Sequence, residues 1–163
     1  MAILKTANGK GRYFNEDAKE VLTEYIFRAD KAIHGYFGGV GVDLINPAGS
    51  MTLVSERFGK TDGVQLRHFI ISFEAWELND PAVANEIAQH TAKYIGQEYQ
   101  ALYSVHEDKP NLHFHLVHNS VSYRTGARYY GRKSEFYAFQ SALRGILRHY
   151  GINKLQYVSS KDY

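Results

Sequence analysis

The sequence predicts an α+β fold in which a central antiparallel sheet is packed with helices. Several short segments rich in apolar and β-branched residues have the length and pattern of strands. Three other segments repeat apolar residues at helical spacing. The 163 residues contain no internal repeat, low-complexity tract or linker, so we expect one domain over residues 1–163.

The first half of the chain is expected to form two strands, a helix and a loop. Residues 2–4 are a short apolar strand, and Asn15 is expected to cap the first helix. The inward face of that helix is expected to hold Val21, Leu22, Tyr25 and Ile26. Residues 35–49 are rich in glycine without clear periodicity, which indicates a long loop or an irregular hairpin. Residues 64–73 form a strand.

The second half alternates between helices and strand pairs. Asp80 before Pro81 predicts the start of a helix that runs to about residue 95. Residues 99–107 and 112–121 are two strands joined by the turn DKPN, and a further hairpin turns at residues 125–126. The last helix covers residues 134–150 and ends before Gly151, and residues 154–158 add an edge strand.

Composition narrows the cellular setting. The chain has no cysteine, which excludes disulfides and thiolate metal sites and fits a reducing compartment. No apolar run approaches the ~20 residues that span a membrane. The first residues, MAILKT, lack the features of a secretory signal. We therefore expect a cytoplasmic protein that does not insert into membranes.

Basic residues gather in one stretch, although the net charge is only +2. Residues 123–133, YRTGARYYGRK, contain four cations and three tyrosines but no acid. Cations follow phosphates and aromatic rings stack on bases, so this composition suits a single nucleic-acid strand. The alternative is a solvated hairpin with scattered tyrosines. The candidate DNA-binding residues here are Arg124, Arg128, Arg132 and Lys133.

Side-chain alternation divides the strand at residues 112–121 into two faces. His113, His115 and Asn119 share one face, because every second side chain of a strand points the same way. Phe114 and Leu116 take the other face, toward the core. His118 falls on that core face, so we do not count it as a ligand.

The hairpin adds a third histidine to the first face. If the turn is centred on residues 109–110, His106 lies directly opposite His113, and opposed residues share a face. The same register puts Tyr103 and Val105 on the core face with Phe114. The packing pattern and the histidine pattern therefore demand the same pairing.

Three imidazoles on one face indicate a metal site that keeps positions open for water or substrate. The ligands would be His106, His113 and His115. Asp108 is a candidate to orient a ligand, and Asn119 to hold a neighbouring side chain or a phosphate. His68 lies on a probable neighbouring strand and is a candidate to border the site; the remaining histidines are interpreted as structural. A buried or surface histidine group without metal is the alternative.

The residues alone do not choose a reaction. A metal held in this way polarises a phosphoryl or carbonyl oxygen or activates water. Tyr25 is one candidate nucleophile among 13 tyrosines. Its place on the apolar stripe of the first helix equally fits an ordinary buried aromatic side chain.

Three segments resemble the motifs of a known family. Residues 106–121, HEDKPNLHFHLVHNSV, resemble the third motif of conjugative relaxases of the MobP type, HxDxxxxHxHxxxN, within the HUH endonucleases. Residues 25–31, YIFRADK, resemble the first motif, a tyrosine followed by an acid–lysine pair. Residues 68–73 with Glu77 resemble the strand HFxxSFxxxE. The resemblance covers nearly the whole chain and implies an HUH-type two-layer sandwich.

The resemblance implies a site- and strand-specific nick at an origin of transfer. Tyr25 would attack the phosphodiester and stay joined to the 5′ phosphate, and the reverse reaction would reseal DNA. A divalent ion on the three histidines, Mg²⁺ or Mn²⁺ by resemblance, with Zn²⁺, Ni²⁺ or Co²⁺ also accepted by imidazoles, would neutralise charge on the phosphate. His68 and Glu77 would support the site, and Arg28 and Lys31 would contact DNA.

The implied partners are the single-stranded and hairpin DNA of the origin, accessory relaxosome proteins and a secretion coupling protein. Relaxases are usually longer, so the chain is expected to be an excised nuclease domain or a minimal enzyme. Three alternatives stay open at this point. They are a replication initiator of the HUH group, a phosphoesterase that uses metal-activated water, and a DNA-binding module in which the metal only braces the sheet.

Overall fold

The computed structural model describes residues 1–7 and 13–159. Within these ranges the helices are α1 (Ala18–Ile26), α2 (Pro47–Arg57), α3 (Pro81–Ile95) and α4 (Lys133–His149). The strands are β1 (Ala2–Thr6), β2 (Ala32–Val40), β3 (Leu66–Ser72), β4 (Ala101–His106), β5 (His113–Asn119) and β6 (Leu155–Val158). None of the helices in the described part of the chain has the length and apolarity that a membrane crossing requires.

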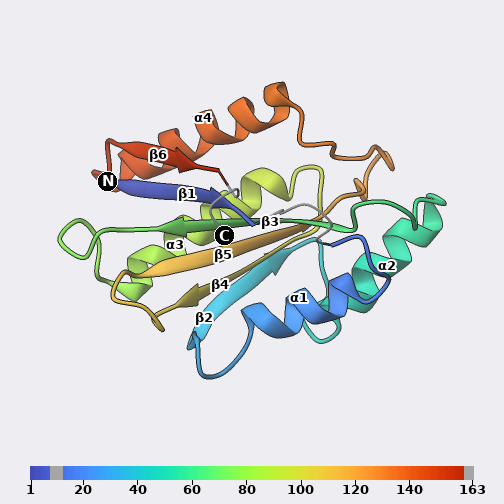
Figure 1. The fold of residues 1–163 in the computed structure, drawn as a ribbon, viewed down its shortest axis with the longest axis horizontal. Coiled ribbons are helices and arrows are strands. Elements are labelled where there is room, and N and C mark those ends of the chain that lie inside the picture. Colours follow the sequence, from blue (N-terminus) through green and yellow to red (C-terminus); the bar gives the residue numbers. More distant parts are fainter. Residues whose placement is uncertain (8–12, 160–163) are drawn as a thin grey trace.

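The six strands form one sheet in the order β2-β4-β5-β3-β1-β6 (Figure 1). Every pairing is antiparallel except that of β1 with β6. The predicted α+β class is confirmed. The edge strand expected near residues 154–158 is β6, although it pairs parallel to β1.

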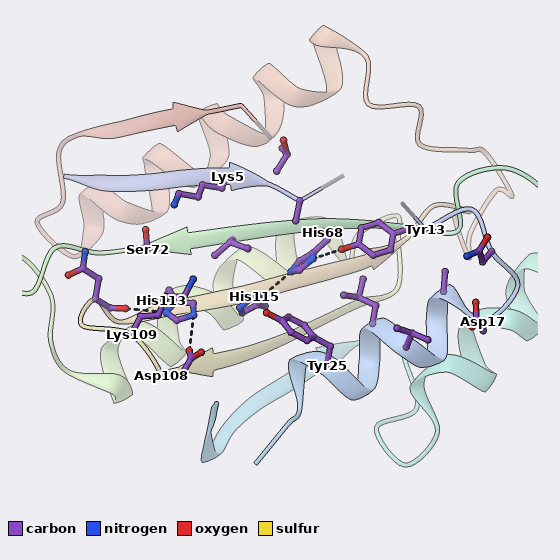
Figure 2. A pocket seen from close by; sticks show the side chains of 18 of the residues that line it. Lys5, Tyr13, Asp17, Tyr25, His68, Ser72, Asp108, Lys109, His113 and His115 are labelled. Carbon is purple, nitrogen blue, oxygen red and sulfur yellow. Dashed lines mark hydrogen bonds and ion pairs between the residues drawn. The ribbon is translucent and has the colours of Figure 1, made fainter. Parts of the chain in front are cut away.

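The two faces of the sheet differ in how they are covered. One face packs against α3 and α4 in the main core, where Phe69, Phe114 and Phe139 are buried. The other face carries a smaller apolar cluster in which α1 and α2 pack on β3, β4 and β5. These two helices add a partial third layer to the expected two-layer sandwich, and α1 also forms a wall of the candidate site (Figure 2).

The β4–β5 hairpin has the predicted register. His106 pairs with His113, Val105 with Phe114, and Tyr103 with Leu116. Tyr103, Val105, Phe114 and Leu116 all belong to the core beneath α3 and α4. In this register His106, His113 and His115 therefore lie on the face of the sheet opposite α3 and α4.

The prediction of a long loop or an irregular hairpin over residues 35–49 is wrong except at residues 41–46, which connect β2 to α2. The rest of residues 35–49 forms the end of β2 and the start of α2. Gly38 reflects close packing, because a Cβ atom there would lie 2.4 Å from the Tyr103 hydroxyl. The helix start carries an ordinary cap, in which the Asn46 side chain accepts a hydrogen bond from Gly49 N at 3.0 Å before Pro47 opens the helix.

The first helix also differs from its prediction. It begins at Ala18. Asn15 lies in the turn before the helix, where the Asn15 carbonyl accepts a hydrogen bond from Ala18 N. Leu22 and Ile26 are buried as expected, but Val21 is exposed and Tyr25 is 38% exposed. The apolar stripe is wider than the buried face because its outer edge borders a cavity.

The ends of the later helices follow the predicted signals. The Asp80 side chain accepts a hydrogen bond from Ala82 N at 2.9 Å at the start of α3. Gly151 follows α4 with a φ of 79°, and Ile152 N donates to the Leu147 carbonyl. The turn expected at residues 125–126 is present beside a bridge between Val121 and Arg128.

Candidate active site

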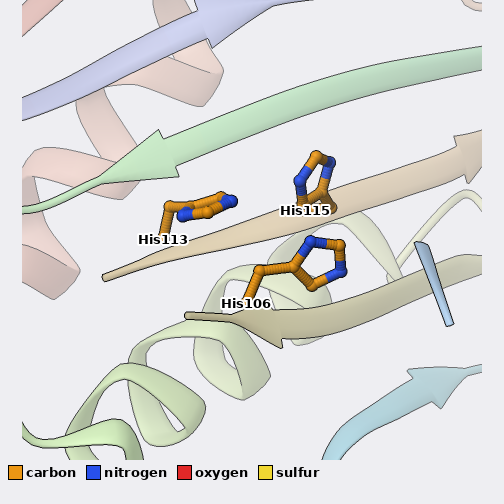
Figure 3. A group of neighbouring side chains, drawn as sticks. All are labelled: His106, His113 and His115. Atoms are coloured by element: carbon orange, nitrogen blue, oxygen red, sulfur yellow. The ribbon is translucent and has the colours of Figure 1, made fainter. Parts of the chain in front are cut away.

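The three predicted histidines converge on the face opposite the main core. His106 ends β4, whereas His113 and His115 lie at the start of β5. All three are buried, and one ligand atom from each lies within 4.8 Å of the others. Figure 3 shows the three rings facing a common space between the two strands. The closest pair is His106 and His115, whose ring centroids are 4.2 Å apart.

Backbone carbonyls fix the tautomers of two of these rings. His106 Nε2 lies 2.7 Å from the Ile26 carbonyl, and His113 Nδ1 lies 3.1 Å from the Asn111 carbonyl. A carbonyl only accepts, so each of these nitrogens carries the hydrogen. The other nitrogen of each neutral ring keeps its lone pair. His106 Nδ1 is buried and has no hydrogen-bond partner among the described residues.

The surroundings keep the cluster neutral. Burial lowers the pKa of His106 and of His113, and it lowers the pKa of His115 well below its ordinary value. The neighbouring imidazoles act in the same direction on His106 and His115. Neutral imidazole is the form that binds metal.

These observations fit a divalent metal ion. Three neutral imidazoles offer nitrogen ligands from one face, and the orphaned Nδ1 of His106 is a buried acceptor that such an ion would satisfy. A set of three leaves coordination positions for water or a phosphate oxygen. Imidazole ligands suit Zn²⁺, Cu²⁺, Fe²⁺ and Ni²⁺.

Asp108 and Lys31 extend the cluster outward. The Asp108 carboxylate lies 3.4 Å from His113 Nε2 and 3.4 Å from Lys31 Nζ. The Lys31 ammonium also lies 5.2 Å from the centroid of the Tyr25 ring. The acid–lysine end of the first motif is thereby joined to the third motif through Asp108.

Tyr25 lies in the last turn of α1, beside the histidines. Its ring meets that of His115 edge to face, with 5.8 Å between centroids. Figure 2 shows its hydroxyl directed toward His115 from the α1 wall. The next residue, Ile26, supplies the carbonyl that holds His106. The turn that carries Tyr25 is thus tied to the cluster by both packing and a hydrogen bond.

A cavity of about 920 Å³ opens over this region, between β1 and α1 (Figure 2). Tyr25, Asp108, His113 and His115 line it, whereas His106 is buried beside them. Its walls also include three residues that sequence reasoning missed, which are Lys5, Tyr13 and Lys109. Their only sequence signal is chemical type, because the approach of β1 and of the segment before α1 depends on the fold.

His68 borders the cavity as expected. It lies on β3, next to β5, and its Nε2 is 2.7 Å from His115 Nδ1. Its other nitrogen is 2.9 Å from the Tyr13 hydroxyl. His68 is therefore linked to the cluster through a ring-to-ring hydrogen bond.

Two supporting candidates lie elsewhere. Asn119 is fully buried, where its amide donates to the Met51 carbonyl and to Gln100 Oε1. These contacts fasten β5 to α2 rather than present an amide to the cavity. Glu77 lies 2.8 Å from the Met1 amino group and is not among the residues that line the cavity.

The candidate DNA-binding cations are dispersed. None of these cations lines the cavity, and the Lys31 side chain reaches its wall through the ion pair with Asp108. Arg28 pairs with Asp30 on the surface, and Arg128 donates to the Asp62 carbonyl at 2.7 Å. Arg124 and Arg132 lie over the rings of neighbouring tyrosines, and Lys133 is exposed at the start of α4.

The fold and this site together define a class of sheet-based domains that present a histidine cluster next to a tyrosine. The model of the family "Relaxase: MobA/VirD2-like, nuclease domain" matches residues 25–152. The chain belongs to this relaxase family. The match begins at Tyr25 and includes the entire histidine cluster.

Individual relatives agree with the family. One protein called rlx from Staphylococcus aureus is 31% identical over 96 residues, covering 59% of this chain and 30% of the relative. A second rlx protein from that organism is 37% identical over 78 residues, covering 48% and 24%. The group II intron-interrupted relaxase LtrB of Lactococcus lactis is 26% identical over 104 residues, covering 63% and 18%. The matches span less than a third of each relative.

Proposed function

We propose that the chain nicks and rejoins one DNA strand at an origin of transfer, with Tyr25 as the nucleophile. The observation that carries this proposal is the packing of the Tyr25 ring on His115, within a chain of the relaxase family. An ordinary buried aromatic would not be 38% exposed at a cavity wall. This exposure leaves the Tyr25 side chain accessible to a substrate in the cavity.

In the proposed reaction the Tyr25 oxygen attacks the scissile phosphorus. A bond forms between that oxygen and the phosphorus, and the bond to the 3′ oxygen breaks. The product is a 5′-phosphotyrosine and a free 3′ hydroxyl. Because the new ester retains the phosphodiester bond energy, attack by a 3′ hydroxyl reverses the step and releases Tyr25.

The neighbouring residues have distinct tasks in this proposal. His106, His113 and His115 would hold the divalent ion, which when bound stabilises negative charge on the phosphate oxygens. Lys31, whose ammonium lies 5.2 Å from the Tyr25 ring centroid, would place a positive charge beside the attacking residue and the phosphate. Asp108 would hold Lys31 in place through its ion pair.

The cavity has room for a strand that enters between β1 and α1. Lys5 and Lys109 line it and would meet phosphates near the cut. Arg28, Arg124, Arg128, Arg132 and Lys133 would contact DNA farther along its path. Accessory relaxosome proteins, a secretion coupling protein and a cytoplasmic location belong to the same proposal.

A covalent-adduct assay tests the reaction. The protein is incubated with Mn²⁺ and single-stranded oligonucleotides tiled across the DNA that flanks its gene, and the products are separated on a denaturing gel. We expect a band of protein-linked DNA that disappears in Tyr25→Phe. Tyr137→Phe is the matched control, because Tyr137 is an exposed tyrosine on α4 outside the cavity.

The alternatives give different gels. Cleavage by Tyr25→Phe without any adduct would replace the proposal with a phosphoesterase that uses water. An adduct that persists in Tyr25→Phe would move the nucleophile to another tyrosine. A cut confined to a replication origin would identify a replication initiator.

A further inference from the structure

The three clustered histidines are held in two different ways. His106 and His113 donate to backbone carbonyls, which accept in every state of the protein. His115 instead meets a side chain, because its Nδ1 lies 2.7 Å from His68 Nε2. Imidazole nitrogens either donate or accept, so only the His115 tautomer depends on a group that itself has two options.

The contact with His68 decides which nitrogen of His115 faces the cluster. Since Nδ1 is occupied by His68, Nε2 is the nitrogen left for a metal ion. A metal-binding Nε2 carries no hydrogen, so the neutral ring carries its hydrogen on Nδ1 and donates it to His68. His68 Nε2 must then accept, which places the hydrogen of a neutral His68 on Nδ1.

Tyr13 is the next member of this hydrogen-bond chain. Its hydroxyl is 2.9 Å from His68 Nδ1 and accepts the hydrogen that the metal-binding arrangement places there. In the reversed arrangement the hydroxyl donates, His68 donates to His115, and the hydrogen of His115 occupies Nε2. That arrangement blocks the ligand position. Only one of the two directions permits a metal ion on His115.

The backbone at Tyr13 holds this residue in one defined position. Its φ is 63°, in the left-handed region that side-chain-bearing residues rarely adopt. The Tyr13 carbonyl accepts a hydrogen bond from Gln65 N at 2.7 Å, just before β3. This local strain is held by the surrounding structure, and it presents the phenol to His68 across the cavity wall.

We infer that His68 is a positioning residue that holds His115 in its metal-binding tautomer, with Tyr13 as the next group in the hydrogen-bond chain. The inference rests on the proposed metal site. His68 and Tyr13 do not bind the metal themselves in this arrangement. They set the direction of the hydrogen bonds that leave His115 Nε2 free to do so.

The test measures Co²⁺ affinity by calorimetry on the folded protein, without DNA. His68→Leu removes the acceptor, and we expect binding to weaken about 10–100-fold, as for other outer partners of metal ligands. His68→Gln offers an amide oxygen near the place of Nε2 and should stay within about threefold of the wild type. Tyr13→Phe should weaken binding by about threefold. His34→Leu, which changes an exposed histidine on β2, is the matched control and should bind normally.

Two results would overturn the inference. One is folded His68→Leu protein that binds Co²⁺ within twofold of the wild type, and the other is His68→Gln that binds as weakly as His68→Leu. Thermal unfolding of each variant establishes that the compared proteins are folded.

Long-range ¹H–¹⁵N spectra of Zn²⁺-loaded wild-type protein provide a readout that needs no variant. The inference expects hydrogens on Nδ1 of both His115 and His68, and a hydrogen on His68 Nε2 would contradict it. His115→Ala separates the two levels of the argument. If this variant binds Co²⁺ normally, the metal site itself is wrong; if it alone loses binding, only the positioning chain is wrong.

Discussion

Strand β5 carries histidines on both of its faces, and their surroundings are opposite in character. His113 and His115 lie beside His106 at the cavity, where each ring has a defined hydrogen-bond partner. His118 lies three residues after His115 on the core face, against the rings of Phe69, Tyr99 and Tyr129. Residue type is the same in both places, but only one face brings several imidazoles together.

Burial has the same effect on the histidine pKa on both faces but a different consequence for the ring. Burial lowers the pKa of His118 to about 4, and it also lowers the pKa of His115. On the core face the result is a neutral ring packed among aromatics, whose Nδ1 hydrogen goes to the adjacent Asn119 carbonyl at 2.8 Å. On the cavity face the neutral rings converge and become available as ligands. The neighbours, not the degree of burial, separate a structural histidine from a candidate ligand.

The largest expected difference is in Co²⁺ affinity, between a variant that lacks a histidine on the cavity face and one that lacks a histidine on the core face. We expect His115→Ala to weaken Co²⁺ binding by more than about 100-fold, beyond the range for outer partners. His118→Leu should bind Co²⁺ as the wild type does, because it alters the other face. Isothermal titration of both variants makes the measurement, and equal losses in the two would erase the distinction between the faces.

Acid should destabilise the protein partly through His118. Its pKa is about 4 when folded and 6.5 in the unfolded reference, so above pH 6.5 neither state binds the proton. As the pH falls from 6.5 to 4, the unfolded chain takes up a proton that the folded protein excludes. The free energy of unfolding should fall by roughly 3 kcal/mol from this group.

Urea unfolding of wild-type and His118→Leu protein between pH 7 and pH 4 measures this contribution. The difference between the two proteins isolates His118 from the other histidines. Parallel stability curves for the two would show that His118 is not held neutral by the core.

Asn119 tests whether every polar residue on the cavity side of β5 belongs to the metal site. It shares that face with His115 but is committed to Met51 and Gln100. Asn119→Ala leaves buried partners unsatisfied, so we expect a loss of about 2 kcal/mol in the free energy of unfolding. Co²⁺ affinity of the folded variant should not change. A large loss of metal affinity without a loss of stability would instead place Asn119 in the site.

The smallest expected effect is on the salt dependence of DNA binding, compared between a cation at the cavity and one far from it. Lys109 lines the cavity, so Lys109→Gln should reduce the salt slope of single-strand binding by about 0.7. The Arg128 guanidinium is engaged with Asp62, so Arg128→Gln should lower stability by about 1 kcal/mol and change the slope less. Fluorescence anisotropy over a series of salt concentrations makes the comparison; the reverse order of slopes would shift the DNA path toward residues 123–133.

The histidine face was predictable because two independent patterns select one register. Alternation in β5 and the pairing of His106 with His113 both depend on local geometry, and both agree with the structure. The Asp80 cap at the start of α3 and the glycine after α4 were likewise predictable, because both depend on local backbone hydrogen bonds and conformation.

Features created by distant contacts were not predictable in this way. Gly38 suits a strand because Tyr103 packs over it, and no local signal reveals that contact. Tyr13 and His68 are far apart in sequence and meet because the fold brings Tyr13 beside the start of β3. Tyr25 looked like a core residue from spacing alone, since the cavity at the edge of the stripe exists only in the assembled fold.

Mapping the covalent adduct by mass spectrometry identifies the tyrosine that becomes joined to DNA. Trypsin cleavage after Lys19 and Arg28 yields EVLTEYIFR, residues 20–28, in which Tyr25 is the sole tyrosine. Tyr13 falls on a separate peptide, residues 13–19. We predict that nucleotide-linked phosphotyrosine appears on residues 20–28 and requires the divalent ion. A nucleotide attached to residues 13–19, or to any other tyrosine, would contradict the assignment of Tyr25.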